Sequence, residues 1–312
     1  MTDRTNDSAS APVVPWQDPR VLLRRAGLHA DASLGQNFLV NPGVVDKIVA
    51  VLRPIRGHLV FEVGPGLGHL TQALAMEADQ VVALDADPRM VRLCRERLSP
   101  LENRVRVIQG DATAVNLREA LGELDRPLLA AGNLPFYCST EILFRLLDDL
   151  DPRRVVIMVQ KEVARRMAAT PGGKEYGSLS VACQVRSDVS VAFDISPGSF
   201  FPQPEVSASV VVMVPRQKLS SVRLAALERV TKVLFGMRRK TLRTSLRKAG
   251  WYDALKGAVG PVSGLADSGL RAERLSPGDF LAMTDALLDR LGPTAMTRQR
   301  GREGPTQGRG HR

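Results

Sequence analysis

The sequence predicts an α/β fold: a doubly wound, Rossmann-like sheet with an antiparallel edge strand, plus a small C-terminal all-helical domain. Short apolar runs alternate with helical stretches up to about residue 215, which is typical of a parallel sheet buried on both faces. Beyond that point the pattern is helical and contains no further strand. The predicted strands are Leu59–Val63, Val81–Asp85, Val105–Gln109, Leu128–Gly132, Val155–Gln160, Val189–Ile195 and Ser209–Val214.

The remaining elements follow in chain order. A short helix is expected from Val21, and Asn41-Pro42 is a typical helix start before apolar residues at helical spacing. Helical patterns over 70–77 and 88–98 separate the first three strands. The last two strands lack a full helix between them, so we expect an antiparallel hairpin at the edge of the sheet. The expected domains are a disordered N-terminal tail (1–19), the sheet domain (20–215), a helical domain (216–292) and a disordered basic tail (293–312).

The charge of the chain is strongly basic and unevenly distributed. Lys and Arg number 43 against 33 Asp and Glu, giving a net charge of +10. Between residues 221 and 250 there are nine Lys or Arg and one Glu. Such a cluster favours a polyanion, either nucleic acid or an anionic membrane surface, and clustering favours nucleic acid. We expect one helix to present the RNA-binding residues Arg238, Arg239, Lys240, Arg243, Arg247 and Lys248, with Leu234, Phe235, Leu242 and Leu246 on its buried side.

Several classes of protein are disfavoured by composition. The three cysteines include no C-x-x-C pair and the four histidines are scattered, so no metal site is expected. A dispersed, odd number of cysteines is typical of a reducing compartment. We find no secretory leader and no apolar run long enough to span a membrane. We therefore expect a cytoplasmic protein, and nothing in the sequence indicates other than a monomer.

The segment Phe61–Gly68 carries the strongest motif, a G-x-G-x-G turn between a strand and a helix. Its spacing differs from the G-x-G-x-x-G of dinucleotide sites, and no Lys-Ser/Thr pair follows as in a P-loop. Asp85 ends the second strand about 20 residues later, where a carboxylate reaches ribose hydroxyls, and Asp111 ends the third strand, where one reaches an adenine amino group. Each feature alone also fits a tight turn or a helix cap. Together they predict an adenosyl-binding site.

The fourth strand leads into Asn133-Leu134-Pro135-Phe136, which suits chemistry on the exocyclic amine of adenine. That nitrogen is a poor nucleophile because its lone pair is delocalised into the ring. The Asn133 side-chain oxygen and the Leu134 carbonyl can each accept one N–H, which directs the lone pair outward. Pro135 would rigidify the turn, and Phe136 would stack on a base flipped out of its helix. The alternative is a simple turn that closes the strand.

These motifs resemble the KsgA-type ribosomal RNA adenine dimethyltransferases over residues 20–290. The matching segments are 34–39, 62–68, 110–112, 133–136, 160–164, 176–180, 201–204 and 238–243. The resemblance implies a class I methyltransferase sheet and S-adenosylmethionine as cofactor. It implies that two adjacent adenines near the 3′ end of small-subunit rRNA are each methylated twice, late in assembly of the ribosomal particle. Cofactor contacts are expected at Asn37, Leu39, Glu62, Gly64, Gly66, Gly68, Asp85, Asp111 and Asn133.

Two positions depart from the family, which usually has Glu at Asp85 and Tyr at Phe136. Both changes keep the relevant chemistry, a carboxylate and an aromatic face. Other readings are a large-subunit rRNA adenine methyltransferase of the antibiotic-resistance type, a catalytically silent RNA-binding assembly factor, and a DNA adenine methyltransferase. For Phe200, Phe201, Pro202 and Pro204, two roles stay open: a loop over the target base, or a hydrophobic lid packed on the sheet.

Overall fold

The computed structural model describes residues 14–256, 258, 262, 264–266 and 268–297. These residues form two compact units. The sheet unit runs to Ala168 and resumes over Arg186–Lys218, and the helical unit comprises Ala169–Val185 and the chain from Leu219 onward. The sequence analysis placed one boundary near residue 216, whereas 169–185 belong to the helical unit. They do so because Tyr176, Val181 and Val185 are buried in the helical unit's apolar core.

The sheet has seven strands in the order β4-β3-β2-β5-β6-β9-β7. The first five are parallel, and β9 is antiparallel to both of its neighbours. The predicted fold class is therefore confirmed, with the antiparallel strand one position inside the edge. The strand bounds are β2 (Leu59–Val63), β3 (Gln80–Asp85), β4 (Val105–Gln109), β5 (Leu128–Asn133), β6 (Arg154–Gln160), β7 (Ser187–Ile195) and β9 (Ala208–Pro215).

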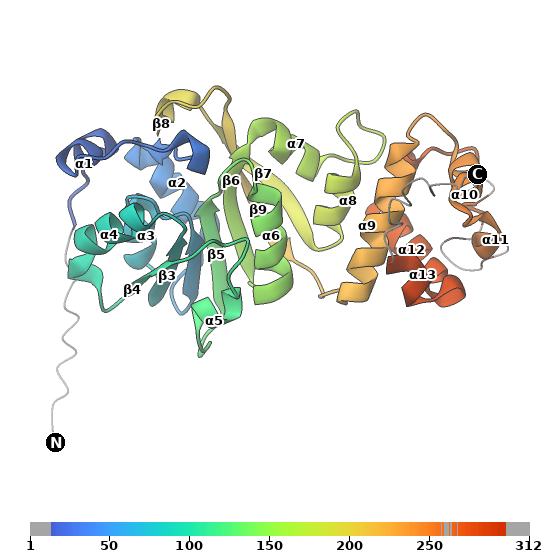
Figure 1. The fold of residues 1–312 in the computed structure, drawn as a ribbon, viewed down its shortest axis with the longest axis horizontal. Coiled ribbons are helices and arrows are strands. Elements are labelled where there is room, and N and C mark those ends of the chain that lie inside the picture. The colour runs from blue at the N-terminus through green and yellow to red at the C-terminus, as the bar shows by residue number, and fades with distance from the viewer. Residues whose placement is uncertain (1–13, 257, 259–261, 263, 267, 298–312) are drawn as a thin grey trace, which may run out of the picture. The chain divides into compact units, whose positions relative to one another are not determined.

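The strand order reverses between β2 and β5. The chain moves outward through β3 and β4, then returns to place β5 on the other side of β2 (Figure 1). At such a reversal the connections after two neighbouring strands leave in opposite directions and open a crevice at the strands' carboxyl ends. Val63 ends β2 and pairs with Gly132, and Asn133 follows as the last residue of β5. The turn motifs predicted from sequence therefore belong at this crevice.

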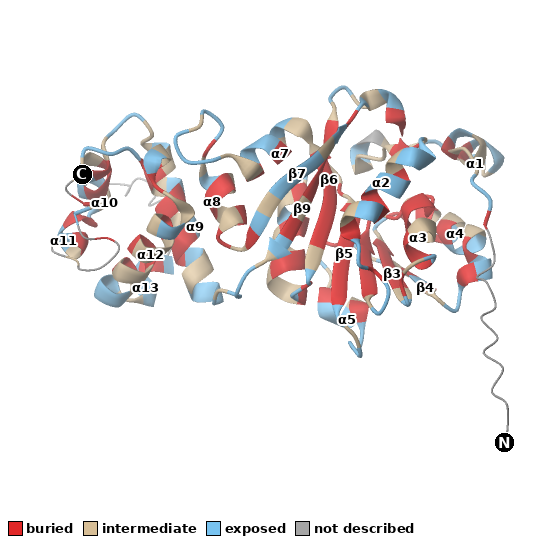
Figure 2. Cartoon of the chain, turned by 180° about the vertical axis from the view of Figure 1, so that it is seen from behind, coloured by how far each residue is buried: buried red, intermediate tan, exposed pale blue. Residues whose placement is uncertain are grey.

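Helices cover both faces of the sheet, since β2 is buried at all five positions and the central strands are buried along their length (Figure 2). On one face, helices α2, α3 and α4 contribute to a single apolar cluster with the strands. Asn41 and Asp87 cap α2 and α4, and each is followed by proline at the first helical position. The helices of the sheet unit are α1 (Pro19–Arg25), α2 (Pro42–Leu52), α3 (His69–Ala75), α4 (Pro88–Arg97), α5 (Leu117–Leu121), α6 (Ser139–Arg145) with the π-turn η3 (Leu146–Leu150), and α7 (Lys161–Ala168).

A two-stranded sheet, which the sequence analysis did not predict, joins distant parts of the sheet unit. Strand β1 (Phe38–Leu39) pairs with β8 (Phe200–Phe201). Phe200 is buried in the main apolar cluster, and Phe201 packs beside Phe38 in a smaller one. Of the two roles left open for these aromatics, the structure therefore shows packing, and this packing holds the strand that carries Leu39.

The helical unit contains α8 (Ser178–Gln184), α9 (Ser221–Gly236), α10 (Leu242–Ala249), α11 (Tyr252–Leu255), α12 (Pro277–Leu291) and α13 (Pro293–Thr297). The rings of Phe235 and Phe280 stack in its core, 5.4 Å apart. The prediction of one helix across Arg238–Lys248 is wrong. Helix α9 ends at Gly236, and Thr241 caps a new helix by accepting from the Thr244 N–H, because a threonine there offers its hydroxyl to the first turn.

Both predicted tails differ from the structure where it describes them. Val14 is buried against the sheet unit, and Pro293–Thr297 form α13 with Met296 buried. Residues 1–13 and 298–312 lie outside the described residues. Short 3₁₀ turns occur at Ala32–Leu34, Ser99–Leu101, Pro197–Ser199 and Ala272–Arg274. Within the described ranges no helix is long and apolar enough to cross a membrane, and no cluster of His, Cys, Asp or Glu is arranged to hold a metal.

Candidate active site

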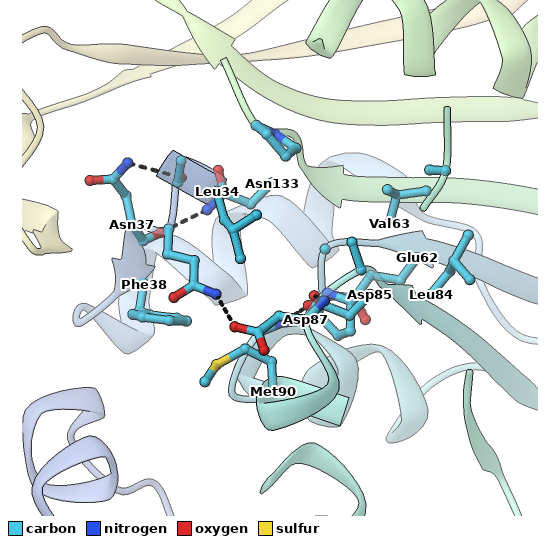
Figure 3. A pocket seen from close by; sticks show the side chains of 18 of the residues that line it. Leu34, Asn37, Phe38, Glu62, Val63, Leu84, Asp85, Asp87, Met90 and Asn133 are labelled. Carbon is cyan, nitrogen blue, oxygen red and sulfur yellow. Dashed lines mark hydrogen bonds between the residues drawn. The ribbon is translucent and has the colours of Figure 1, made fainter. Parts of the chain in front are cut away.

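A cavity opens at the carboxyl ends of β2, β3, β4 and β5, with a space of about 970 Å³ counting the part open to solvent. The structure brings most of the predicted site residues into its wall (Figure 3). Those residues are Asn37, Leu39, Glu62, Gly64, Gly66, Asp85, Asp111, Asn133 and Pro135. Gly68, Leu134 and Phe136 do not line the cavity, although each lies within two residues of one that does.

The glycine turn keeps the floor of the cavity free of side chains. Gly64 and Gly66 have φ angles of +75° and +54°, a backbone region that side chains rarely tolerate. A Cβ at Gly64 would lie 3.1 Å from the Asn133 carbonyl oxygen, and one at Gly66 would lie 2.9 Å from the Phe38 ring. Backbone and neighbours thus require glycine at both positions. Gly68, with φ +79°, is the N-cap residue that precedes α3.

The Asp85 carboxylate is built into this turn. Its Oδ2 accepts from the Gly66 N–H at 3.0 Å, and its Oδ1 accepts from the Asp87 N–H at 2.9 Å. Burial raises the pKa of Asp85, while these backbone N–H groups oppose the rise. A carboxylate has about four acceptor sites, so both oxygens retain lone pairs, and Asp85 lines the cavity. Asp85 can therefore hold the turn and accept hydrogen bonds from a ligand's hydroxyls.

Glu62 lies deeper, with 1% of its surface exposed. Its Oε2 is among the buried side-chain atoms for which no hydrogen-bond partner is found in the described part of the chain. Burial raises the pKa of Glu62 to about 8, the neighbouring Thr71 side chain opposes the rise, and the nearby Asp85 charge adds to it. A buried acceptor without a partner is rare, and it commonly marks a position where a ligand completes the bonding.

Asp111 lies at the end of β4 and is exposed. Its Oδ1 accepts from the backbone N–H and the hydroxyl of Thr113, at 2.8 and 2.7 Å. These bonds shape the turn after the strand and fall on one oxygen only. The other oxygen is placed to accept from an amino group in the cavity.

The Asn133 side chain has a defined orientation. Its Nδ2 donates to the Asn37 carbonyl at 2.8 Å, across 96 residues of sequence (Figure 3). A carbonyl can only accept, so the amide must turn its NH₂ group toward Asn37 and its Oδ1 away. Asn133 lines the cavity, and its Oδ1 is not used in this bond, so it can act as an acceptor.

The turn after Asn133 leaves one backbone carbonyl, that of Leu134, out of its own hydrogen bonds. The Pro135 carbonyl accepts from the Cys138 N–H, and the Phe136 carbonyl accepts from the Ser139 hydroxyl. Among the turn contacts of the described residues, none uses the Leu134 carbonyl as an acceptor. The Leu134 side chain is buried, whereas the Phe136 ring is half-buried and the Tyr137 side chain is 70% exposed.

The basic residues of the helical unit have two different environments. Arg238 pairs with Glu273 at 3.0 Å and donates to the carbonyls of Gly173 and Lys174, so it braces a loop of its own unit. The other predicted residues are exposed: Arg239 and Lys240 in the turn between α9 and α10, and Arg243, Arg247 and Lys248 on α10. The guanidinium groups of Arg243 and Arg247 lie over the Tyr252 ring, 5.8 and 4.6 Å from its centre.

Residues 27–287 match a family model described as "Ribosomal RNA adenine dimethylase". The chain belongs to the ribosomal RNA adenine dimethylase family. A relative from Geobacter sulfurreducens, named "Ribosomal RNA small subunit methyltransferase A", is 40% identical over 85% of this chain and 98% of its own length. A relative of the same name from Aromatoleum aromaticum is 40% identical over 82% of this chain and 94% of its own length.

Two solved structures share the fold of this dimethylase. A dimethyladenosine transferase from Plasmodium falciparum superposes with a TM-score of 0.69 at 24% identity, covering 81% of this chain and 98% of its own. The 23S rRNA methyltransferase ErmE superposes with a TM-score of 0.61 at 22% identity, covering 80% and 99%. At these identities the superpositions support the Rossmann-like sheet and say nothing about substrate.

The sequence analysis of this dimethylase missed several residues that line the cavity. Asp87 is 3% exposed and binds the Gln36 side chain at 2.8 Å, which ties the segment before β1 to the end of β3. His69 and Tyr137 also lie in the cavity wall. Asp87 had a sequence signal, since an Asp before proline commonly caps a helix. Its hydrogen bond to Gln36, 51 residues away, had no signal in the sequence.

Proposed function

We propose that this chain transfers methyl groups from S-adenosylmethionine to the N6 of two adjacent adenines near the 3′ end of small-subunit rRNA, twice at each adenine. The family description and the relatives' names support this assignment. One observation carries it: the Asn133 amide, in the wall of a cavity that fits an adenosyl group, is anchored by its nitrogen, which leaves its oxygen as the acceptor for a ligand. An oriented acceptor beside a methyl donor is what N-methylation of adenine requires.

The cavity fits the cofactor in three places. The unpartnered Glu62 oxygen would accept from the ammonium of the methionine part. Asp85 would accept from the ribose hydroxyls, and Asp111 from the adenine amino group. The bare backbone at Gly64 and Gly66 leaves room for the part of the cofactor that links its methionine group to its ribose. When bound, the cofactor supplies a methyl group on a sulfonium, which is a good leaving group.

The protein's own contribution is positioning of the target base. The Asn133 Oδ1 and the Leu134 carbonyl would each accept one N6–H, so that the nitrogen lone pair points at the methyl carbon. As the C–N bond forms, the C–S bond breaks and the nitrogen gains positive charge. Its proton then becomes acidic and passes to solvent, so no strong general base is needed. Phe136 would stack on the flipped base.

The helical unit would hold the RNA through its exposed cations. Arg239, Lys240, Arg243, Arg247 and Lys248 are exposed, and exposed cations suit phosphates. We assign Arg238 mainly to bracing, because it is engaged by Glu273. The proposed partner is small-subunit rRNA within a pre-ribosomal particle in the cytoplasm. We expect this chain to bind it as a monomer.

The test is methylation of isolated subunits with labelled S-adenosylmethionine, followed by mapping of the modified adenines. We expect label in two adjacent adenines of undermethylated small subunits, as N6,N6-dimethyladenine. Label in large-subunit RNA instead would favour the antibiotic-resistance class of enzyme. Tight binding to small subunits without methyl transfer would favour a silent assembly factor, and either result contradicts the proposal.

A further inference from the structure

The segment Val14–Asp18, here called the N-terminal strap, packs against the helix that opens at the glycine turn. Val14 is 8% exposed and joins the main apolar cluster of the sheet unit. The family match begins at residue 27, so the strap lies outside it. The family match therefore does not account for this contact, and its role has to be inferred from the structure.

The first contact is with His69, which begins α3 and lines the cofactor cavity. The rings of Trp16 and His69 lie 4.4 Å apart at 49°. The His69 Nε2 lies 2.7 Å from the Gln17 carbonyl, and because a carbonyl only accepts, that nitrogen carries the proton. Burial, with the nearby Arg97 charge, lowers the pKa of His69 to about 4, so the ring is neutral at physiological pH.

The second contact runs through Gln72, one turn further along α3. Its Nε2 donates to the Val14 carbonyl, and its Oε1 accepts from the Arg97 guanidinium. Arg97 also donates to the carbonyls of Leu67 and Gly68, at 3.2 and 2.9 Å. Both contacts therefore end on Leu67–His69, the part of the glycine turn that leads into α3.

We propose that the N-terminal strap is a positioning element of the cofactor site, which fixes the glycine turn and thereby sets the affinity for S-adenosylmethionine. This inference rests on the proposed function, because it assigns the adenosyl cofactor to the cavity. The strap residues themselves do not line the cavity. They act through His69 and Arg97, which contact the end of the glycine turn at Leu67–His69.

The test compares Trp16→Ala with Trp16→Phe, which keeps an aromatic face over His69. Binding of S-adenosylmethionine and S-adenosylhomocysteine is measured by calorimetry on the full chain. An aromatic pair of this kind corresponds to roughly a 2- to 12-fold change in an equilibrium constant, so we expect the Kd of Trp16→Ala to rise by about that factor. Trp16→Phe should restore most of the affinity. A chain lacking residues 2–17 should show a larger rise, and one lacking 2–12, which keeps the strap, is its matched control.

Steady-state kinetics distinguish a role of the strap in positioning the cofactor site from a general loss of protein stability. The strap variants should raise the KM for cofactor, while kcat at saturating cofactor and the KM for RNA stay within about twofold of wild type. A lower melting temperature with an unchanged cofactor Kd would overturn the proposal, as would an equal loss of RNA binding. If the unaltered chain binds neither cofactor nor its product, the proposed function fails together with the strap. If it binds both and the variants bind equally well, only the strap proposal fails.

Discussion

The buried carboxyl of Glu62 makes the stability of the unliganded protein depend on pH in a way that one substitution should remove. The side chain is 1% exposed, and its Oε2 is an acceptor without a partner among the described residues. Burial raises the pKa of Glu62 from the usual 4.5 to about 8. The folded protein therefore keeps this proton over a pH range in which the unfolded chain has already lost it.

The sign follows from which state binds the proton more tightly. Above pH 4.5 the unfolded chain gains stability by ionising Glu62, and the folded protein does not follow until about pH 8. Stability contributed by this group is thus present below pH 4.5 and is lost as pH rises to about 8. Each pH unit in that window lowers the free energy of unfolding by about 1.4 kcal/mol, so the full loss is about 5 kcal/mol at most.

The perturbation is Glu62→Gln, which keeps the shape of the protonated carboxyl but cannot ionise. Urea unfolding of unliganded wild type and variant at pH 5, 6, 7 and 8 should give similar stabilities near pH 5. By pH 8 the variant should be the more stable by several kcal/mol. Glu205→Gln, a substitution at an exposed glutamate, is the matched control and should follow wild type. Parallel pH profiles for Glu62→Gln and wild type would refute the reasoning.

The same variant tests the place of Glu62 in the cofactor site. If its carboxylate accepts from the cofactor's ammonium, binding requires the proton to leave, so wild-type affinity should increase with pH up to about 8. Glu62→Gln should bind more weakly and without this pH dependence. Equal affinity at every pH would remove Glu62 from the site while leaving its effect on stability intact.

Three further predictions concern the residues assigned to the target base, to the ribose of the cofactor and to the RNA phosphates. Asn133→Ala should lower kcat by roughly 100-fold or more with cofactor Kd nearly unchanged, and near-normal turnover would defeat its assigned role. Asp85→Ala should weaken cofactor binding, measured by calorimetry, and an unchanged Kd would exclude it from the site. Replacing Arg239, Arg243 and Arg247 together with serine should reduce the slope of log affinity for RNA against log salt by about 2–3. An unchanged slope would show that these arginines do not contact phosphates.

Much of the site was predictable because it depends on local chemistry at strand ends. The glycine turn, Asp85 and Asn133 each follow a buried strand, and parallel strands present their carboxyl ends at one edge of a sheet. Each of these features is an apolar strand followed directly by Gly, Asp or Asn, and such a pattern can be recognised within a few residues of sequence. The seven strands and their order of appearance were readable for the same reason.

Prediction failed where a local pattern was compatible with two structures. The basic run at 238–248 has helical spacing, yet Thr241 caps a new helix and Arg238 is drawn to Glu273. Spacing alone cannot show that a charged side chain already has a partner 35 residues away. The Ser, Asp, Asn and Pro content of 1–19 likewise suggested disorder, while the Trp16 ring packs against that of His69.

The sequence by itself determined which chemical groups stand at the ends of the strands, because side-chain alternation and turn residues act over a few positions. Only the tertiary structure decided how these groups are aimed. The Asn133 amide is fixed with its nitrogen on a carbonyl 96 residues away, and the strand β1, which begins next to that carbonyl, is held by pairing with β8. Such contacts join chain segments that come together only on folding. The orientation of each side chain is therefore stabilised by tertiary hydrogen bonds and packing, which the local sequence does not reveal.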